Sequence, residues 1–180
     1  MAGLVDRMIR ASKLDANLYE EVEADKEAMG QAVIVVLLSS IAAGIGTVGV
    51  LGFGGIIATM VGALIGWFIW AFLTYIIGTR FLPEPETNAD MGEMLRTIGF
   101  SSSPGVLRIL ALIPVVGAFI SFGVGIWMLV AMIIAVKQAL DYKSTWRAVG
   151  VCLIGFIVYF LIFFLIFSIF GIKPTIDAGT

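Results

Sequence analysis

The sequence predicts an all-α membrane protein, a bundle of five transmembrane helices with short amphipathic helices on its cytoplasmic side. Hydrophobic residues make up 60% of the 180 residues and charged residues only 13%, against about 45–50% and 25% in soluble domains. The charges are also segregated, since no Asp, Glu, Lys or Arg occurs in residues 28–79, 109–136 and 148–172. Each stretch exceeds the roughly 20 apolar residues that a helix needs to cross a bilayer. These observations exclude a soluble fold.

Residues 1–29 predict a cytoplasmic N-terminal segment rather than a cleavable signal peptide, because acidic residues stand where an apolar region is required. Within it, residues 3–14 predict a short amphipathic helix. Its apolar side holds Leu4, Val5, Met8, Ile9 and Ala11, and its polar side holds Asp6, Arg7, Arg10 and Lys13. Such a helix suits the headgroup layer of the membrane or docking onto the protein's own bundle, and the pattern leaves both open.

Residues 17–29 predict a second short helix with one acidic side. The acidic residues are Glu20, Glu21, Glu23, Asp25 and Glu27. A solvated helix face is the ordinary explanation of such a run of charges. The sharper interpretation is a docking surface for a cytoplasmic protein partner, with Glu20, Glu21, Glu23 and Asp25 as its candidate residues.

The uncharged residues 28–79 are long enough for two crossings, since one unbroken helix would extend about 78 Å. Four glycines within residues 49–55 permit a tight reversal of the chain. We therefore predict the first crossing at residues 30–50 and the second at 56–78. The membrane domain as a whole is predicted to span residues 30–172, followed by a short outer tail at 173–180.

Met91, Met94, Leu95 and Ile98 share one face and predict a short helix lying along the membrane. Asp90 and Glu93 have the spacing of a capping box, and Glu93 and Arg96 are expected to face away from the apolar side. Three serines followed by Pro104 predict the end of this helix, because proline removes a backbone donor and restricts the residue before it.

The distribution of Lys and Arg along the chain indicates whether residues 102–116, which include Arg108, cross the membrane. If they do, nearly all Lys and Arg residues lie on the inner side, as the positive-inside rule requires, and only Lys173 lies outside. If they form a re-entrant piece instead, the basic residues 137–147 move to the outer face and the rule is broken. We therefore predict five crossings, the last three at residues 102–116, 118–137 and 149–171.

The predicted spans offer no catalytic chemistry. They contain no His, Asp or Glu, so the hydroxyls of Ser39, Ser40, Thr59 and Ser121 have no base to activate them. The lone Cys152 is interpreted as a small packing residue. We expect no catalytic residue, no cofactor and no metal site, and therefore no enzyme. The net charge of −2 gives no reason to expect a nucleic acid partner.

Small residues recur every fourth position on two predicted spans. The second span holds Ala58, Gly62 and Gly66, and the fourth holds Gly117, Ser121 and Gly125. Small residues at this spacing let helix backbones approach closely in lipid. These six residues are candidates for helix packing, either within the chain or between copies in a homo-oligomer.

Short segments spread over residues 14–171 resemble a known family. They are Leu18–Asp25 (LYEEVEAD), 31–32 (QA), Leu95–Phe100 (LRTIGF), Ile113–Gly117 (IPVVG), Gly125–Trp127 (GIW), Val136–Leu140 (VKQAL) and Ser144–Ala148 (STWRA). Their order and spacing resemble the Yip domain family, the Ypt/Rab-interacting integral membrane proteins. The resemblance implies five membrane helices and an inner N-terminus. Eukaryotic members act in vesicle traffic and bind prenylated Rab GTPases.

One difference from the eukaryotic members bears on the partner. Leu18-Tyr19 is followed here by Glu20-Glu21, where a eukaryotic member is expected to have Gly-Pro. The chain therefore looks like a prokaryotic-type member, for which no prenylated Rab is expected.

The sequence favours a non-enzymatic protein of a prokaryotic cytoplasmic membrane, with its N-terminus inside and its C-terminus outside. We expect it to organise or scaffold the lipid bilayer or partner proteins. The alternative is a channel or transporter of small or lipid-like solutes, which segments interrupted by glycine and proline favour. The lack of ionisable residues in most of the spans speaks against this alternative.

Overall fold

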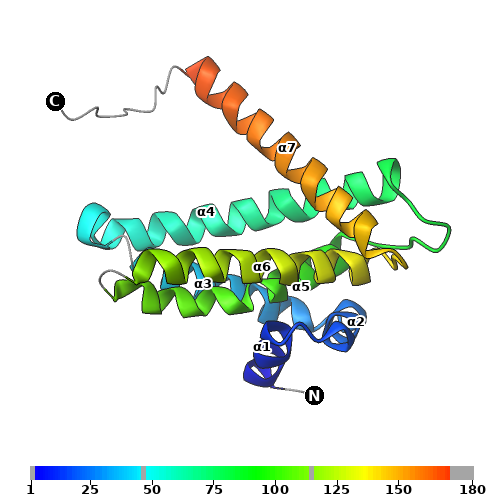
Figure 1. Ribbon diagram of the computed structural model, residues 1–180, viewed down its shortest axis with the longest axis horizontal. Coiled ribbons are helices and arrows are strands. Elements are labelled where there is room, and N and C mark those ends of the chain that lie inside the picture. Colours follow the sequence, from blue (N-terminus) through cyan, green and yellow to red (C-terminus); the bar gives the residue numbers. More distant parts are fainter. Residues whose placement is uncertain (1–2, 46–47, 114–115, 171–180) are drawn as a thin grey trace.

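The computed structural model describes residues 3–45, 48–113 and 116–170 as an all-helical protein without strands (Figure 1). Within these ranges, four helical stretches are long and apolar enough to cross a membrane: Ala28–Ile45, Gly54–Phe81, Gly117–Ala139 and Thr145–Ile162. The protein is therefore an integral membrane protein that crosses the bilayer several times. The predicted tail at 173–180 lies outside the described residues.

Two short helices precede the membrane helices and pack against them. Helix α1 covers Leu4–Ser12 and helix α2 covers Ala16–Ala24. Leu18, Tyr19 and Val22 of α2 are fully buried in a cluster with residues of the membrane helices. Of the two interpretations of the first helix, docking onto the bundle is the one observed, although Val5 and Ile9 of α1 stay exposed.

Helix α3 (Ala28–Ile45) and helix α4 (Val48–Ile76) are the first two long helices, and α4 continues into a π-helix, η1 (Ile77–Phe81). The turn predicted at residues 49–55 is wrong, because these residues form the beginning of α4. Glycine permits a reversal but does not impose one. Backbone groups away from water must be hydrogen-bonded internally, which favours continuing the helix.

Helix α5 (Met91–Ser101) begins with the predicted capping box. The backbone N–H of Glu93 donates to Asp90 Oδ1 at 2.8 Å, and that of Asp90 donates to Glu93 Oε2 at 2.6 Å. The expected orientation of Arg96 is wrong, since this side chain is buried against α2. Helix α5 packs among α3, α4 and helix α6 (Gly117–Ala139) instead of lying apart from them.

A 3₁₀-helix, η2 (Ser103–Leu112), follows α5 and has Pro104 in its first turn. It runs between α3 and α6, so that α5 and η2 together form one rod beside α6 (Figure 1). The rod ends near the C-terminal end of α3 in this view. Helix α7 (Thr145–Phe170) starts beside α4 and α6 and diverges from the bundle towards its C-terminal end.

The outer faces of the long helices are apolar. On α4 the exposed hydrophobic side chains recur at helical spacing: Ile57, Val61, Ile65, Phe68 and Phe72. A soluble monomer rarely exposes a contiguous apolar surface of this kind. A surrounding lipid bilayer accounts for it, because lipid chains are as apolar as these residues.

Candidate functional site

Arg7 joins the two N-terminal helices to the membrane bundle. Its side chain is only 4% exposed and forms ion pairs with Glu21 at 2.9 Å and with Asp25 at 2.8 Å. It also donates to Gln31 Oε1 on α3 at 3.1 Å. One guanidinium, a planar group with five donors, thus holds α1, α2 and α3 together.

Arg10 extends this ionic cluster towards the surface. It pairs with Asp15 at 2.8 Å and with Glu21 at 2.5 Å. Its hydrogen bond is the main reason that the pKa of Glu21 lies below its ordinary value, and Arg7 lowers that pKa further. The pKa of Asp25 is lowered chiefly by the hydrogen bond from Arg7. Two of the four candidate partner-binding acids, Glu21 and Asp25, are therefore engaged within the chain.

Arg96 caps the C-terminal end of helix α2. The side chain is only 4% exposed, and its Nε donates to the carbonyl oxygen of Val22 at 2.8 Å while Nη2 donates to that of Glu23. The last carbonyls of a helix have no partner within the helix and carry its negative dipole end, so a guanidinium there is stabilising. This contact fixes α2 against α5.

The other two candidate acids, Glu20 and Glu23, meet acids from other helices at a polar cavity of about 450 Å³. Glu93 of α5 and Asp141, which follows α6, also line it, together with Lys137, Gln138 and Tyr142. Gln138 Nε2 donates to Glu20 Oε1 at 2.8 Å. We call Glu20, Glu23, Glu93 and Asp141 the acidic surface.

Burial raises the pKa of Glu23 to about 7, and the nearby carboxylates of Asp141, Glu93 and Glu20 add to the effect. The folded protein therefore keeps this proton at a pH where the unfolded chain, with an ordinary pKa of 4.5, releases it. Stability should fall as the pH rises from about 4.5 to about 7. Because Glu23 is only half-buried and solvent screens its charge, we expect a fall of about 1 kcal/mol.

Thermal melting of the parent and of Glu23→Gln across this pH range tests the prediction. The melting temperature of the variant should fall much less with rising pH than that of the parent, because Gln cannot titrate. The lowered pKa values of Glu21 and Asp25 act only below about pH 4.5 and do not interfere. Equal slopes in parent and variant would show that folding does not raise the pKa of Glu23.

Three of the six candidate packing residues make no close contact with another helix of the chain. A Cβ placed on Gly62, Gly66 or Gly125 would meet no atom within 4 Å. At Gly117 it would lie 2.0 Å from the carbonyl oxygen of Ala111, where η2 turns into α6. Ala58 is exposed and Ser121 is partly exposed. A contact between copies of the chain through these residues stays a prediction.

Close helix approach occurs at other small residues. A Cβ on Gly99 of α5 would lie 2.8 Å from that of Ala32 on α3, and one on Gly105 of η2 would lie 1.9 Å from Ser39 Oγ. Both positions therefore require glycine. They explain how α5 and η2 fit tightly against α3, which the four-residue spacing did not predict.

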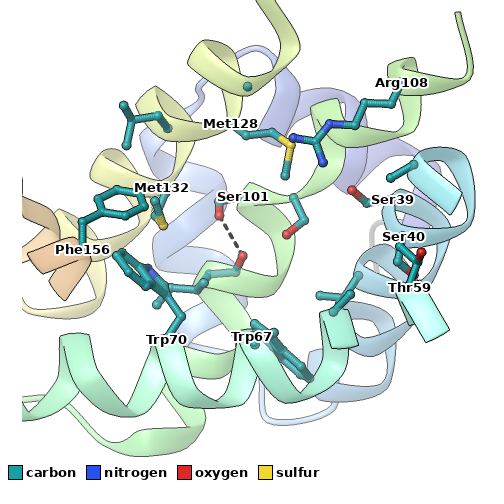
Figure 2. A pocket seen from close by; sticks show the side chains of 18 residues that line it. Ser39, Ser40, Thr59, Trp67, Trp70, Ser101, Arg108, Met128, Met132 and Phe156 are labelled. Atoms are coloured by element: carbon teal, nitrogen blue, oxygen red, sulfur yellow. Dashed lines mark hydrogen bonds between the residues drawn. The ribbon is translucent and has the colours of Figure 1, made fainter. Parts of the chain in front are cut away.

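A second cavity, of about 340 Å³, lies in the middle of the membrane bundle (Figure 2). Helices α3, α4, α5 and η2 contribute its polar side chains, Ser39, Ser40, Thr59, Ser101, Ser102 and Arg108. Its aromatic and sulfur-containing side chains are Trp67, Trp70, Met128, Met132 and Phe156. Gly66 and Gly125 also line it, so these two predicted packing residues leave space rather than fill it.

The sequence of this chain matches one known family model. A family model described as the Yip1 domain matches residues 17–166. The chain belongs to the Yip1 domain family. Comparison with curated proteins and with solved structures gave no match. The resemblance drawn from the sequence is thereby confirmed, and the prokaryotic-type assignment stays a prediction.

The Yip1 domain match begins in α2 and ends in α7, and therefore covers both cavities and leaves out α1. The family is one of non-enzymatic, trafficking-associated membrane proteins. Sequence reasoning missed three arginines with distinct roles in this fold: Arg7, Arg96 and Arg108. The sequence did contain a signal for them, because each lies near an apolar segment. Burying a charge is costly, so an arginine in such a place needs a partner.

Proposed function

We propose that this Yip1 domain protein is a non-enzymatic membrane organiser that binds a basic segment of a protein partner at its cytoplasmic acidic surface. The observation that carries the proposal is the convergence of Glu20, Glu23, Glu93 and Asp141, from three parts of the chain, on one cavity. Lys137 is the single cation among the residues that line this cavity. Such a surface attracts Lys- and Arg-rich segments and orients the partner as it approaches.

The N-terminal helices are a rigid support for this surface. Arg7 and Arg96 fix α2 from both sides, and Glu21 and Asp25 are neutralised within the chain. The acids left for a partner are therefore Glu20 and Glu23 on α2, together with Glu93 and Asp141. The proposed site differs in this way from the four acids that the sequence suggested.

The contacts between two loops support five crossings with this surface inside. Lys143 Nζ lies 2.6 Å from Glu86 Oε1, and Arg147 Nη1 donates to the carbonyl oxygen of Pro83 at 2.8 Å. The loop before α5 and the loop after α6 are thus on the same side of the membrane. If α6 crosses once between them, the α5–η2 rod crosses as well, which gives five crossings. It extends about 36 Å at 1.5 Å per α-helical and 2.0 Å per 3₁₀ residue.

Cysteine labelling tests this topology. In a Cys152→Ser background, Glu86→Cys and Lys143→Cys should react with an impermeant thiol reagent only from the cytoplasmic side. Val116→Cys, at the start of α6, should react only from the outer side. Reaction of Glu86→Cys and Val116→Cys from the same side would contradict five crossings and leave α5–η2 as a re-entrant rod.

Neutralising the acidic surface tests partner binding. The triple variant Glu20→Gln, Glu23→Gln and Asp141→Asn should bind a Lys/Arg-rich helical peptide at least tenfold more weakly than the parent. Binding to the parent should itself weaken strongly between 0.1 and 1 M salt, where the Debye length falls from about 10 Å to 3 Å. Fluorescence anisotropy with the protein in nanodiscs measures both effects.

The matched control also removes three negative charges, but from exposed acids outside the acidic surface: Asp6→Asn, Glu27→Gln and Glu86→Gln. It should bind the peptide like the parent. Equal weakening of both triple variants would show a general effect of net charge, and the acidic surface would then have no specific role. Cross-linking to membrane proteins in cells should likewise be lost in the acidic-surface variant and kept in the control variant.

A solute pathway is the second candidate function, and the membrane cavity is the observation that favours it. Liposomes containing the parent or the acidic-surface variant distinguish the two functions. Conductance or solute uptake that is equal in both proteins, without any loss of peptide binding in the variant, would favour the pathway over the organiser.

A further inference from the structure

Besides the partly exposed hydroxyl of Ser102, three hydrogen-bond donors at the membrane cavity have no acceptor within the described part of the chain. The first is the hydroxyl of Ser39 on α3, a residue that is 5% exposed. The second is Nε1 of Trp70 on α4, a residue that is 8% exposed. The third is the guanidinium of the half-buried Arg108 on η2.

Three neighbouring hydroxyls, those of Ser40, Thr59 and Ser101, differ from Ser39 because each donates within its own helix. Ser40 Oγ donates to the carbonyl oxygen of Leu37 at 2.8 Å, Thr59 Oγ1 to that of Gly55 at 2.7 Å, and Ser101 Oγ to that of Ile98 at 2.7 Å. Buried polar groups are nearly always hydrogen-bonded, and an unpaired one costs about 1–3 kcal/mol. Within the described residues, Trp70 Nε1 is the buried side-chain donor without a partner, and Ser39 and Arg108, whose donors are also unpaired, line the same cavity.

The two sides of the cavity differ in chemistry. In Figure 2, Ser39, Ser40 and Thr59 lie on one side, and the Arg108 side chain extends towards the cavity from above them. Trp70, Met132 and Phe156 lie on the opposite side. The Trp70 and Phe156 rings pack with their centroids 4.5 Å apart. One side is thus polar and cationic, and the other is aromatic and apolar.

We infer that this cavity binds a single-chain amphiphile from the bilayer, with an anionic carboxylate or phosphate headgroup against Arg108 and Ser39 and its apolar chain against Trp70, Met132 and Phe156. The described acids do not line this cavity, so the guanidinium has no counter-charge within it. A charge inside a membrane protein normally pairs with a partner or faces a ligand pathway. An anionic headgroup would supply the counter-charge for Arg108 and an acceptor for the Ser39 hydroxyl.

The volume and composition of the cavity fit such a ligand. A space of about 340 Å³ is at the small end of the range for ligand sites, about 300–1,000 Å³. Ligand sites are usually apolar with a few well-placed polar groups, as here. The space suits one chain better than two, which selects a fatty acid or a lysophospholipid over a diacyl lipid. This inference is independent of the acidic surface.

Tryptophan quenching by chain-brominated lipids tests the proposal directly. Replacing the two other tryptophans (Trp127→Phe, Trp146→Phe) leaves Trp67 and Trp70, which both line the cavity. In phosphatidylcholine nanodiscs, brominated stearate or brominated lysophosphatidate should quench the fluorescence of these two tryptophans, and the quenching should saturate. Brominated lysophosphatidylcholine, which is zwitterionic, should bind at least tenfold more weakly. Comparison of stearate with lysophosphatidate identifies the headgroup.

Two pairs of variants locate the chain and the headgroup. Gly125→Leu should fill the cavity and weaken quenching at least tenfold, whereas Gly123→Leu, on the same helix but outside the cavity, should behave like the parent. Added Cβ atoms meet nothing within 4 Å at either position, so both variants should fold. Arg108→Gln should abolish the preference for anionic lipid, and Arg108→Lys should retain it.

Three results would overturn the proposal: quenching that does not saturate, equal quenching in Gly125→Leu and Gly123→Leu, or no anionic preference in the parent. If Gly125→Leu does not fold, Gly66→Leu replaces it, because its Cβ also meets nothing within 4 Å and it lines the same cavity. The Arg108 pair tests the headgroup without depending on either glycine.

Discussion

Replacing Arg7 with Met is expected to release helices α1 and α2 from the membrane bundle. The substitution removes ion pairs to Glu21 and Asp25 and the hydrogen bond to Gln31. Breaking a buried ion pair typically costs about 3–5 kcal/mol. The two carboxylates keep 33% and 27% exposure, so water recovers part of this loss. We expect about 2–3 kcal/mol of local destabilisation.

Hydrogen–deuterium exchange measures this release. Amides of α1 and α2 should exchange at least about 30-fold faster in the variant, since 1.4 kcal/mol corresponds to a factor of ten. Amides of α4 and α6 should change little. The control is Lys13→Met, which removes the same charge from an exposed residue near the end of α1. Acceleration of the same size in the control would mean that general electrostatics, and not the Arg7 contacts, holds these helices.

The long apolar helices were the most predictable part of the fold, because absence of charge over a membrane-spanning length admits few alternatives. The position of the first turn was not predictable from glycine alone. The four glycines in residues 49–55 allow both a reversal and a helix, and the helix is observed.

The α5–η2 rod was predictable only in part. The capping box between Asp90 and Glu93 is local, and the sequence placed it correctly. The direction of Arg96 depends on α2, which lies 74 residues away in the chain. Helical periodicity places a residue on a face but does not say which neighbour covers that face. An arginine beside an apolar stripe therefore looks exposed until its distant partner is known.

The candidate site shows the same limit. The run of acids on α2 marked a functional region, but the sequence did not separate Glu21 and Asp25, which pair with Arg7, from Glu20 and Glu23, which meet Asp141. The spacing of small residues predicted close packing at Gly66 and Gly125, and the structure has a cavity there. A missing side chain can accommodate a neighbouring helix or leave space, and spacing alone does not decide between them.

Replacing Arg96 with Met is expected to have the largest effect on the half of the protein that contains α1 and α2. The side chain is 4% exposed, and its loss leaves the carbonyl oxygens of Val22 and Glu23 without their donor at the end of α2. A hydrogen bond from a charged group contributes about 1.5–3 kcal/mol. With two such bonds lost, we expect a destabilisation of about 3 kcal/mol or more. Helix α2 should exchange its amides faster, and α5 should follow because the two helices pack together.

Arg96→Lys and Arg80→Met make this prediction specific. Lysine keeps the charge at the helix end but lacks the planar fork, so it should recover only about half of the lost stability. Arg80→Met removes the same charge from an exposed residue of η1 and should leave the exchange of α2 unchanged. Arg96 also lowers the pKa of Glu23, so the stability of Arg96→Met should fall more steeply with rising pH than that of the parent. Parent-like exchange in α2 and a parent-like pH slope in Arg96→Met would show that α2 is held by its apolar contacts alone.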